Sequence, residues 1–170
     1  QGVKLPKVTK SPPQVLSKEE SGQLIKSLDG HWLQPIVIIA LTTGMRLGEI
    51  LALHWKHFDA DAAELKIQQS VSYTKDTGVF LKPPKSETGQ RTIALSRLAT
   101  DTLNKVRANH LERSMALGSS NNDTPVFDRW QQTGQLGKLL PSHIVSDHFR
   151  RHIEKLNITK VRFYNLRHTH

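Results

Sequence analysis

The sequence predicts an α+β fold that is mainly helical, with a small antiparallel sheet of three strands. Helical spacing of apolar residues runs through residues 17–55, 96–117 and 142–156, whereas the alternation typical of strands is confined to residues 65–95. At 170 residues, the chain has the length of about one ordinary domain and can bury a core. We therefore expect one domain, over residues 14–170.

The first 13 residues differ in composition from the rest of the chain. They contain one glycine, three prolines and three lysines, which favour exposed, irregular backbone over helix or strand. We predict that residues 1–13 form an arm or an interdomain linker. Because the chain opens in such sequence, and with Gln1 rather than Met, we also expect it to be an excised piece of a longer protein.

The charge balance points to a polyanionic partner. Lys and Arg number 24 against 15 acidic residues, which gives a formal net charge of +9. Nucleic acid is the first candidate, and an anionic membrane surface is a weaker one because no long basic amphipathic helix stands out. The absence of cysteine excludes disulfides, thiolate nucleophiles and Cys-based zinc sites. No stretch approaches the ~20 apolar residues that span a bilayer.

Caps and apolar spacing predict the helices. Ser17 and Glu20 form a capping box for a first helix that Gly30 ends, and Pro35 suits the first turn of a second helix. Residues 36–41 are apolar on every side, so we expect the second helix to lie in the core. Two further helices are expected, over residues 96–117 and 142–156.

Three short segments show the period of strands. Residues 65–73 alternate apolar and polar side chains, residues 79–81 follow a Thr-Gly turn, and residues 91–95 resume after a loop rich in Pro, Ser and Gly. We predict that these three segments form one antiparallel meander. Residues 130–140 are polar and contain glycine, so we expect a mobile loop there.

Gly44 and Arg46 lie at the break between the second helix and a third. Gly44 lets the chain turn where other residues would be strained, and Leu47, Ile50 and Leu51 then form one face of the next helix. Arg46 falls in the first turn, where free backbone N–H groups and the helix dipole favour an anion. A guanidinium held there would make a phosphate site, although a surface arginine on an ordinary helix hairpin has the same pattern.

This stretch resembles the first arginine box of the tyrosine recombinases, the phage integrase family. The family pattern is T-G-x-R-x-x-E-x-x-x-L-x-W, and this chain reads T-G-M-R-L-G-E-I-L-A-L-H-W over residues 43–55. Of the acidic pair that follows in the family, only Asp59 is kept. The resemblance implies that Arg46 grips the scissile DNA phosphate and that Glu49 supports it.

A second resemblance lies in the predicted turn before the third strand. Integrases carry a hairpin ending in K-(T/S)-x-x-S-x-R-T-(I/V)-P-L, and K-S at residues 85–86 with R-T-I at residues 91–93 is similar to it, although alanine stands where proline is usual. The resemblance makes Lys85 the candidate general acid, which donates a proton to the leaving 5′ oxygen. Lys82 is close enough to be confused with it, and a solvated loop lysine is the alternative for both.

The end of the chain resembles the family's second arginine box, H-x-L-R-H-T. Leu166, Arg167, His168 and Thr169 match, and Tyr164 replaces the leading histidine. The resemblance implies that Arg167 joins the first arginine on the phosphate, with His168 in support. A phenol with a pKa of about 10 donates a hydrogen bond but is a poor base, so proton removal would need help from the arginines or from a group beyond this chain.

The resemblance implies the integrase catalytic-domain fold and transesterification without a cofactor or metal. A tyrosine attacks a DNA phosphate, forms a 3′-phosphotyrosyl bond and frees a 5′-hydroxyl for strand exchange. In the family that tyrosine follows the second arginine by some tens of residues, so we expect this chain to lack the nucleophile and the C-terminal part of the domain. We therefore expect it to bind DNA phosphates without cleaving them. Further DNA contacts are expected from Lys82, Arg91, Arg150 and Arg151.

The implied partners are double-stranded DNA carrying a recombination site, further copies of the full-length parent and accessory DNA-bending proteins, with no membrane involved. The implied location is the bacterial cytoplasm, for a protein encoded by a bacterium or a phage. Two other functions stay open. A type IB topoisomerase shares the chemistry, and a DNA-binding module that has lost catalysis would explain the tyrosine in place of the histidine.

Overall fold

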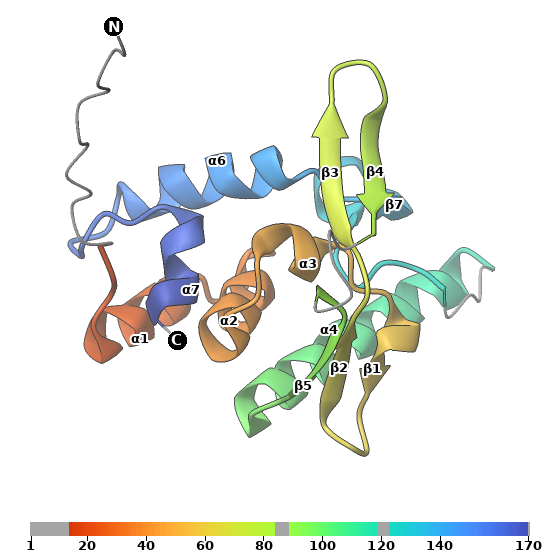
Figure 1. The fold of residues 1–170 in the computed structure, drawn as a ribbon, viewed down its shortest axis with the longest axis horizontal. Helices are drawn as coiled ribbons and strands as arrows, with labels where there is room; N and C mark the ends of the chain where they lie inside the picture. The colour runs from red at the N-terminus through yellow and green to blue at the C-terminus, as the bar shows by residue number, and fades with distance from the viewer. Residues whose placement is uncertain (1–13, 84–88, 119–122, 170) are drawn as a thin grey trace, which may run out of the picture.

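Helix α2 (Gln34–Thr43) lies at the centre of the fold, in contact with α1, α3, α4 and α7 (Figure 1). Residues 36–40 of this helix are all buried, as expected for a segment that is apolar on every side. Pro35 occupies its first turn. Gly44 ends it with a φ of 61°, in the left-handed conformation that glycine adopts without strain.

The computed structural model describes residues 14–83, 89–118 and 123–169. Within these ranges, no helix combines the length and the apolar character that crossing a lipid bilayer requires. The other helices are α1 (Lys18–Ser27), α3 (Leu47–Leu51), α4 (Arg97–Ala116), α5 (Trp130–Thr133), α6 (Ser142–Ile153) and α7 (Leu166–Thr169), with 3-10 turns at Trp55–His57 and Phe163–Asn165.

The strands form one three-stranded sheet and two sheets of two strands, all antiparallel in the described residues. The larger sheet has the order β1-β2-β5, β3 pairs with β4, and β6 pairs with β7. Their bounds are β1 (Phe58–Asp59), β2 (Glu64–Ile67), β3 (Ser70–Thr74), β4 (Gly78–Lys82), β5 (Arg91–Ala94), β6 (Asp128–Arg129) and β7 (Gln135–Leu139).

A three-stranded antiparallel sheet is present, but the meander predicted over residues 65–95 is wrong in its pairing. The segment 65–73 is divided, because β2 pairs with β5 whereas β3 pairs with β4 in a hairpin that projects beyond the helices in Figure 1. Leu65, Ile67 and Val71 are all buried, so the alternation continues across the break. Periodicity alone therefore could not reveal where one strand ends.

The mobile loop predicted over residues 130–140 is also wrong, because this region forms α5 and β7. The carboxylate of Asp128 organises it by accepting hydrogen bonds from the backbone N–H groups of Trp130 at 3.1 Å and Gly137 at 2.8 Å. Polar composition indicated a loop here, but one side chain supplies partners to backbone groups at both ends of the segment.

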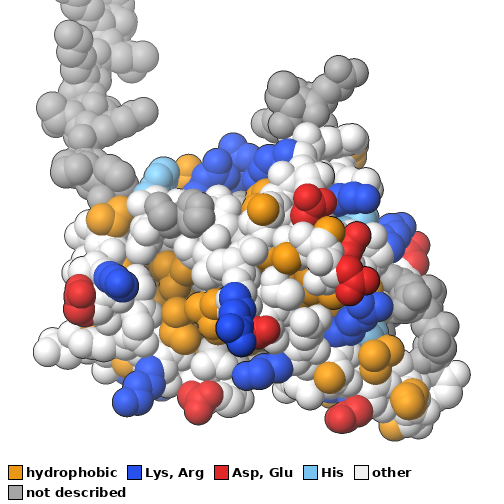
Figure 2. Space-filling view, turned by 90° about the horizontal axis from the view of Figure 1, so that it is seen from below, with side chains coloured by type: hydrophobic (Ala, Val, Ile, Leu, Met, Phe, Trp, Pro, Cys, Tyr) orange, Lys and Arg blue, Asp and Glu red, His pale blue; other side chains and the backbone are white. Residues whose placement is uncertain are grey.

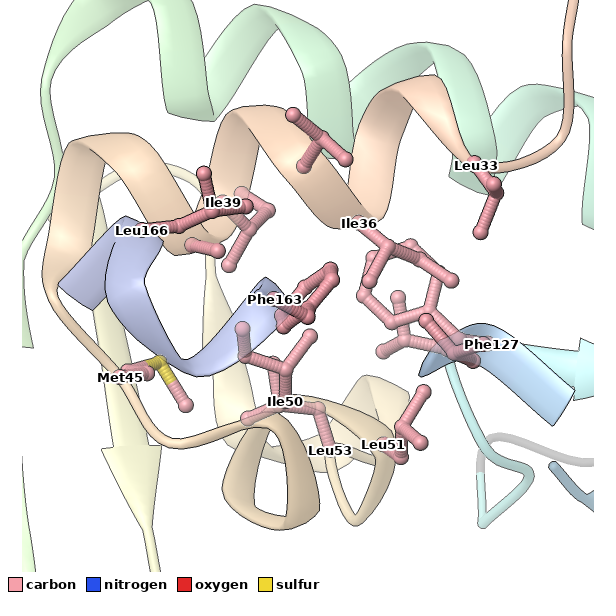
Figure 3. Close-up of a cluster of buried hydrophobic side chains, with 14 of the residues drawn as sticks. Leu33, Ile36, Ile39, Met45, Ile50, Leu51, Leu53, Phe127, Phe163 and Leu166 are labelled. Atoms are coloured by element: carbon pink, nitrogen blue, oxygen red, sulfur yellow. The ribbon is translucent and has the colours of Figure 1, made fainter. Parts of the chain in front are cut away.

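Apolar side chains from α2, α3 and the C-terminal segment meet in one core (Figure 3). Ile36 and Ile39 of α2 point toward Ile50 of α3 and toward Phe163 and Leu166. Each of these five side chains is at most 5% exposed. Burial of this apolar surface stabilises the fold and fixes the two arginine boxes relative to each other.

Helix α3 lies against strand β3 at Gly48. A Cβ atom at Gly48 would lie 2.9 Å from the carbonyl oxygen of Val71 and closer still to the hydroxyl oxygen of Ser70. Because a Cβ atom does not approach other heavy atoms so closely, the missing side chain is what lets the two backbones pack together. This contact sets the position of the helix that follows Arg46.

Candidate functional site

Arg46 is the N-cap residue of α3, and its side chain is 62% exposed. Its backbone N–H donates to Oε2 of Glu49 at 2.9 Å, and its Nη1 donates to Oε1 of the same carboxylate at 3.1 Å. The turn at Gly44 makes this possible, because it takes the chain out of α2 just before Arg46 begins the next helix. The sequence predicted Arg46 in the first turn, and the structure places it at the cap.

The two arginine boxes meet at one small pocket. The pocket has a volume of about 100 Å³, and it is lined by Arg46 from the first box and by Tyr164 and Arg167 from the second. The structure thus brings together three residues that the sequence predicted for one site. The remaining lining includes Met45, Ser146 and Phe163.

Arg167 presents a buried donor at this site. It lies in α7 beside Leu166, which is fully buried and anchors the helix in the core. Nη1 of Arg167 is shielded from solvent and has no hydrogen-bond partner among the described residues. A buried N–H group without a partner costs free energy, and a phosphate oxygen reaches this one only where the side chains that cover it move aside. The two arginines that line the pocket are what suit it to an anion.

Tyr164 lines the pocket with a side chain that is largely solvent-accessible, at 62% exposure. Its ring packs edge-on against the ring of His168, with 5.3 Å between the centroids. His168, predicted as a supporting residue, is itself exposed and contacts Tyr164 in this way. Tyr164 precedes Arg167 by three residues, the spacing at which the resemblance predicts a histidine.

Among the predicted site residues that the structure describes, Glu49 is the most buried, at 7% exposure for the whole residue. In addition to the two hydrogen bonds from Arg46, it accepts one from Nη1 of Arg91 at 3.2 Å and one from Nη2 at 2.8 Å. Burial acts to raise the pKa of this carboxyl, but the hydrogen bonds from Arg91 and Arg46 outweigh it and hold the pKa below its usual value. Glu49 is thus ionised at neutral pH and holds the side chain of Arg46 by a hydrogen bond.

The other residues predicted to contact DNA lie on separate elements. Lys82 is exposed at the end of β4, and Arg150 and Arg151 are exposed on α6, where Arg150 lies 3.4 Å from the carboxylate of Glu154. The structure therefore does not bring these side chains into the pocket. Lys85, the candidate general acid, lies outside the described residues.

Ser146 is a pocket residue that the sequence did not predict. It is exposed on α6 and faces the same small cavity as the arginines. No motif marks it, because serine at an exposed helix position is common. Only tertiary packing identifies Ser146 as a pocket residue. Helix α6 contacts both α3 and β3, and this packing places Ser146 next to the first arginine box.

The chain carries a formal net charge of +9. On the face drawn in Figure 2, basic and acidic side chains are interspersed with exposed hydrophobic side chains. A second cavity of about 490 Å³ is lined by Trp32, Lys105 and Phe127 among others, and none of its lining residues belongs to the site predicted from the sequence. Among the described residues, no group of three His, Cys, Asp or Glu side chains is arranged to hold a metal ion.

The sequence profile described as the phage integrase family matches residues 14–170. Among curated proteins, the chain is similar to a tyrosine recombinase XerC-like protein of Caldanaerobacter subterraneus subsp. tengcongensis, with 25% identity over 92% of this chain and 42% of that protein. It is also similar to the ICEBs1 integrase of Bacillus subtilis, with 27% identity over 78% of this chain and 34% of that protein. The chain therefore spans less than half the length of these relatives.

Solved structures share the fold. The Tn1549 transposon integrase in complex with transposon right end DNA aligns with a TM-score of 0.78 and 16% identity, over 96% of this chain and 54% of the other. XerA recombinase aligns with a TM-score of 0.67 and 18% identity, over 98% of this chain and 52% of the other. The predicted α+β class and integrase catalytic-domain fold are thereby confirmed.

Proposed function

The chain belongs to the phage integrase family, and we propose that it supplies the DNA-phosphate site of a site-specific recombinase. The observation that carries this proposal is the pocket that Arg46 and Arg167 both line. Two guanidiniums at one pocket suit the oxygens of a phosphodiester, which they bind through paired, directional hydrogen bonds. The net charge of +9 supports DNA as the polyanion.

The reaction proposed for the parent protein is transesterification at a DNA phosphate. A tyrosine oxygen attacks phosphorus, the bond to the 5′ oxygen breaks, and a 3′-phosphotyrosyl bond forms. Negative charge on the non-bridging oxygens is stabilised by Arg46 and Arg167. Lys85 is proposed to give a proton to the leaving 5′ oxygen. A 5′-hydroxyl then attacks the phosphotyrosyl bond, which rejoins the strand and releases the tyrosine.

Tyr164 is proposed as a hydrogen-bond donor to the phosphate rather than as the nucleophile. It lines the pocket beside Arg167, where a hydroxyl is placed to hold an oxygen of the phosphate. Tyr73 is the other tyrosine of the chain and belongs to β3, away from the pocket lining. The nucleophile is therefore proposed to come from the parent protein beyond residue 170, so that this chain by itself binds DNA without cleaving it.

The proposed partners follow from the same chemistry. Lys82, Arg150 and Arg151 are proposed to contact the DNA backbone outside the pocket, since all three are exposed cations. Solved lambda integrases include a dimer bound to a core site and a tetramer bound to a Holliday junction. We propose a homo-oligomer for the parent of this chain as well, acting on bacterial DNA in the cytoplasm with accessory DNA-bending proteins.

Binding of a short fluorescein-labelled duplex to this chain, followed by anisotropy over a range of salt, tests the phosphate site. Arg46→Gln and Arg167→Gln should each weaken binding and lower the slope of log K against log salt by about one. Arg97→Gln is the matched control, because Arg97 is a 95% exposed arginine of α4. If both pocket variants bind DNA as tightly as the wild type does, the pocket is not part of the DNA interface.

The catalytic part of the proposal is tested with the parent protein and a nicked duplex that carries its recombination site. A denaturant-resistant protein–DNA adduct, absent in Arg46→Gln and Arg167→Gln, is the expected result. Salt-sensitive binding without an adduct on any nicked substrate would indicate a DNA-binding module that has lost catalysis. Relaxation of supercoiled DNA without joining of partner sites would indicate a type IB topoisomerase.

A further inference from the structure

In the proposed phosphate site, the exposed arginine is bonded to a charged carboxylate. Nη1 of Arg46 lies 3.1 Å from Oε1 of Glu49, which also accepts hydrogen bonds through its other oxygen. A guanidinium paired with one carboxylate has no net charge, and a phosphate that approaches Arg46 also meets the negative charge of Glu49. Arg167 adds its own positive charge to the pocket, but the negative charge of Glu49 beside Arg46 still needs a positive charge to offset it.

Arg91 supplies that charge. Its Nη1 and Nη2 bind the two oxygens of Glu49 at 3.2 and 2.8 Å, in the paired geometry that arginine forms with a carboxylate. The three side chains together carry one net positive charge. The side chain of Arg46 is 62% exposed, that of Arg91 32% and that of Glu49 9%, so the uncompensated charge lies toward solvent on the side of Arg46.

The sheet fixes Arg91 in this position. Arg91 is the first residue of β5, and its backbone is paired with Ile67 of β2. Its guanidinium crosses from the sheet to α3, where the four hydrogen bonds from Arg46 and Arg91 use the four lone-pair positions of the Glu49 carboxylate. The register of β2 and β5 thus determines whether the charge of Glu49 is offset.

We propose that Arg91 is a positioning residue of the phosphate site that acts through Glu49. It neutralises and orients the Glu49 carboxylate, so that Arg46 is held in place without losing its attraction for phosphate. This inference rests on the proposed function of the pocket. It replaces the role of a direct DNA contact that the sequence predicted for Arg91, because the terminal nitrogens of Arg91 are engaged by Glu49.

The test compares duplex binding by the wild-type chain, Arg91→Gln, Glu49→Gln and the double variant over a range of salt. Arg91→Gln alone should weaken binding about tenfold, or about 1.4 kcal/mol, because the charge of Glu49 is then no longer offset. In the Glu49→Gln background, the same Arg91→Gln change should alter affinity by less than about threefold and leave the salt slope unchanged.

The opposite pattern would overturn the inference. If Arg91 contacts a DNA phosphate directly, Arg91→Gln weakens binding equally in both backgrounds and lowers the salt slope by about one in each. Circular dichroism establishes that each variant is folded. If Arg91→Gln alone does not fold, the two variants in the Glu49→Gln background still decide between the roles, because that background contains no buried carboxylate at this site.

Arg167→Gln in the same assay separates this inference from the proposed function. If Arg167→Gln and Arg46→Gln bind DNA as the wild type does, the phosphate site is rejected, and the role of Arg91 with it. If these two variants bind weakly while Arg91→Gln binds normally, the phosphate site stands and only the role of Arg91 is rejected.

Discussion

Helices α1 and α3 begin with the same local arrangement and then use it differently. In each helix, a glutamate at the third position accepts the backbone N–H of the N-cap residue at 2.9 Å, Glu20 from Ser17 and Glu49 from Arg46. The remaining acceptor positions differ. Glu20 accepts two hydrogen bonds of 2.7 Å from the backbone N–H and the hydroxyl of Thr159, whereas Glu49 takes up two guanidiniums.

The same capping pattern thus has two uses: in α1 it joins distant parts of the fold, and in α3 it holds charged side chains at the candidate site. The distant partner of Glu20 is neutral, and its hydrogen bonds join α1 to the segment that follows α6. The partners of Glu49 are charged, and its side chain is 9% exposed. Loss of a charged partner in a buried setting costs more than loss of a neutral hydrogen-bond partner in a partly buried one. The first helix should therefore tolerate changes that the third does not.

The largest expected effect is that of Glu49→Ala on stability. Without the carboxylate, the half-buried guanidinium of Arg91 loses its ion pair with residue 49. We therefore expect the free energy of unfolding, measured by urea denaturation, to fall by about 2–3 kcal/mol. The matched variant Glu20→Ala removes the equivalent cap of α1 and should lower the free energy of unfolding by less. Equal losses in the two variants would contradict the contrast between the two helices.

Next in size is the effect of adding a methyl group to the glycine of each helix. Gly48→Ala places a Cβ 2.9 Å from the carbonyl oxygen of Val71, so we expect a loss of about 1–3 kcal/mol as α3 and β3 move apart. Gly22→Ala in α1 is the matched control, since a Cβ there meets nothing within 4 Å. It should stabilise the chain by about 0.5–1 kcal/mol, because alanine favours the helix.

Thermal unfolding followed by circular dichroism measures both glycine variants. A Gly48→Ala chain as stable as the wild type would show that the approach of α3 to β3 is not tight. DNA binding by Gly48→Ala should also weaken, because the same shift displaces Arg46 at the cap of α3.

A smaller effect is expected on the acid side of the stability curve. Hydrogen bonds from Ser17 and Thr159 hold the pKa of Glu20 below its ordinary value of 4.5, and Glu49 also has a lowered pKa, since its hydrogen bonds outweigh the effect of burial. The stability that each contributes is therefore fully present above pH 4.5 and is lost as the pH falls through the folded pKa.

Urea unfolding over a series of pH values between 5 and about 2 measures this dependence. Glu49→Gln and Glu20→Gln should each flatten the curve, because an amide does not titrate. An unchanged acid slope in Glu49→Gln would mean that the carboxylate does not depend on its arginines for its low pKa.

The smallest effect is expected from Thr159→Val, which tests the partner of Glu20. The variant removes the hydroxyl donor but keeps the backbone N–H, so one of the two bonds to Glu20 survives. We expect a decrease in Tm smaller than that of Glu20→Ala, measured by calorimetry. A larger decrease would indicate that the hydroxyl, and not the cap of α1, holds the two segments together.

Much of the local structure could be predicted from the sequence. The capping box at Ser17, the buried course of α2, the turn at Gly44 and the limits of α4 were all predicted and are confirmed. Each depends on residues within one or two turns of one another. The resemblance of the two arginine boxes to those of the integrases also implied a common site, and Arg46 and Arg167 line one pocket.

By itself, then, the sequence determined the positions of the turns, of the helix caps and of the arginines. The tertiary structure alone decided the partner of Glu49, the division of the segment 65–73 between two sheets, and the place of Ser146 beside the pocket. The physical reason is that these contacts join residues far apart in the chain. Any strand pairing that buries the same face satisfies the apolar periodicity. The order of charged residues in the sequence likewise does not show which oppositely charged side chains form an ion pair.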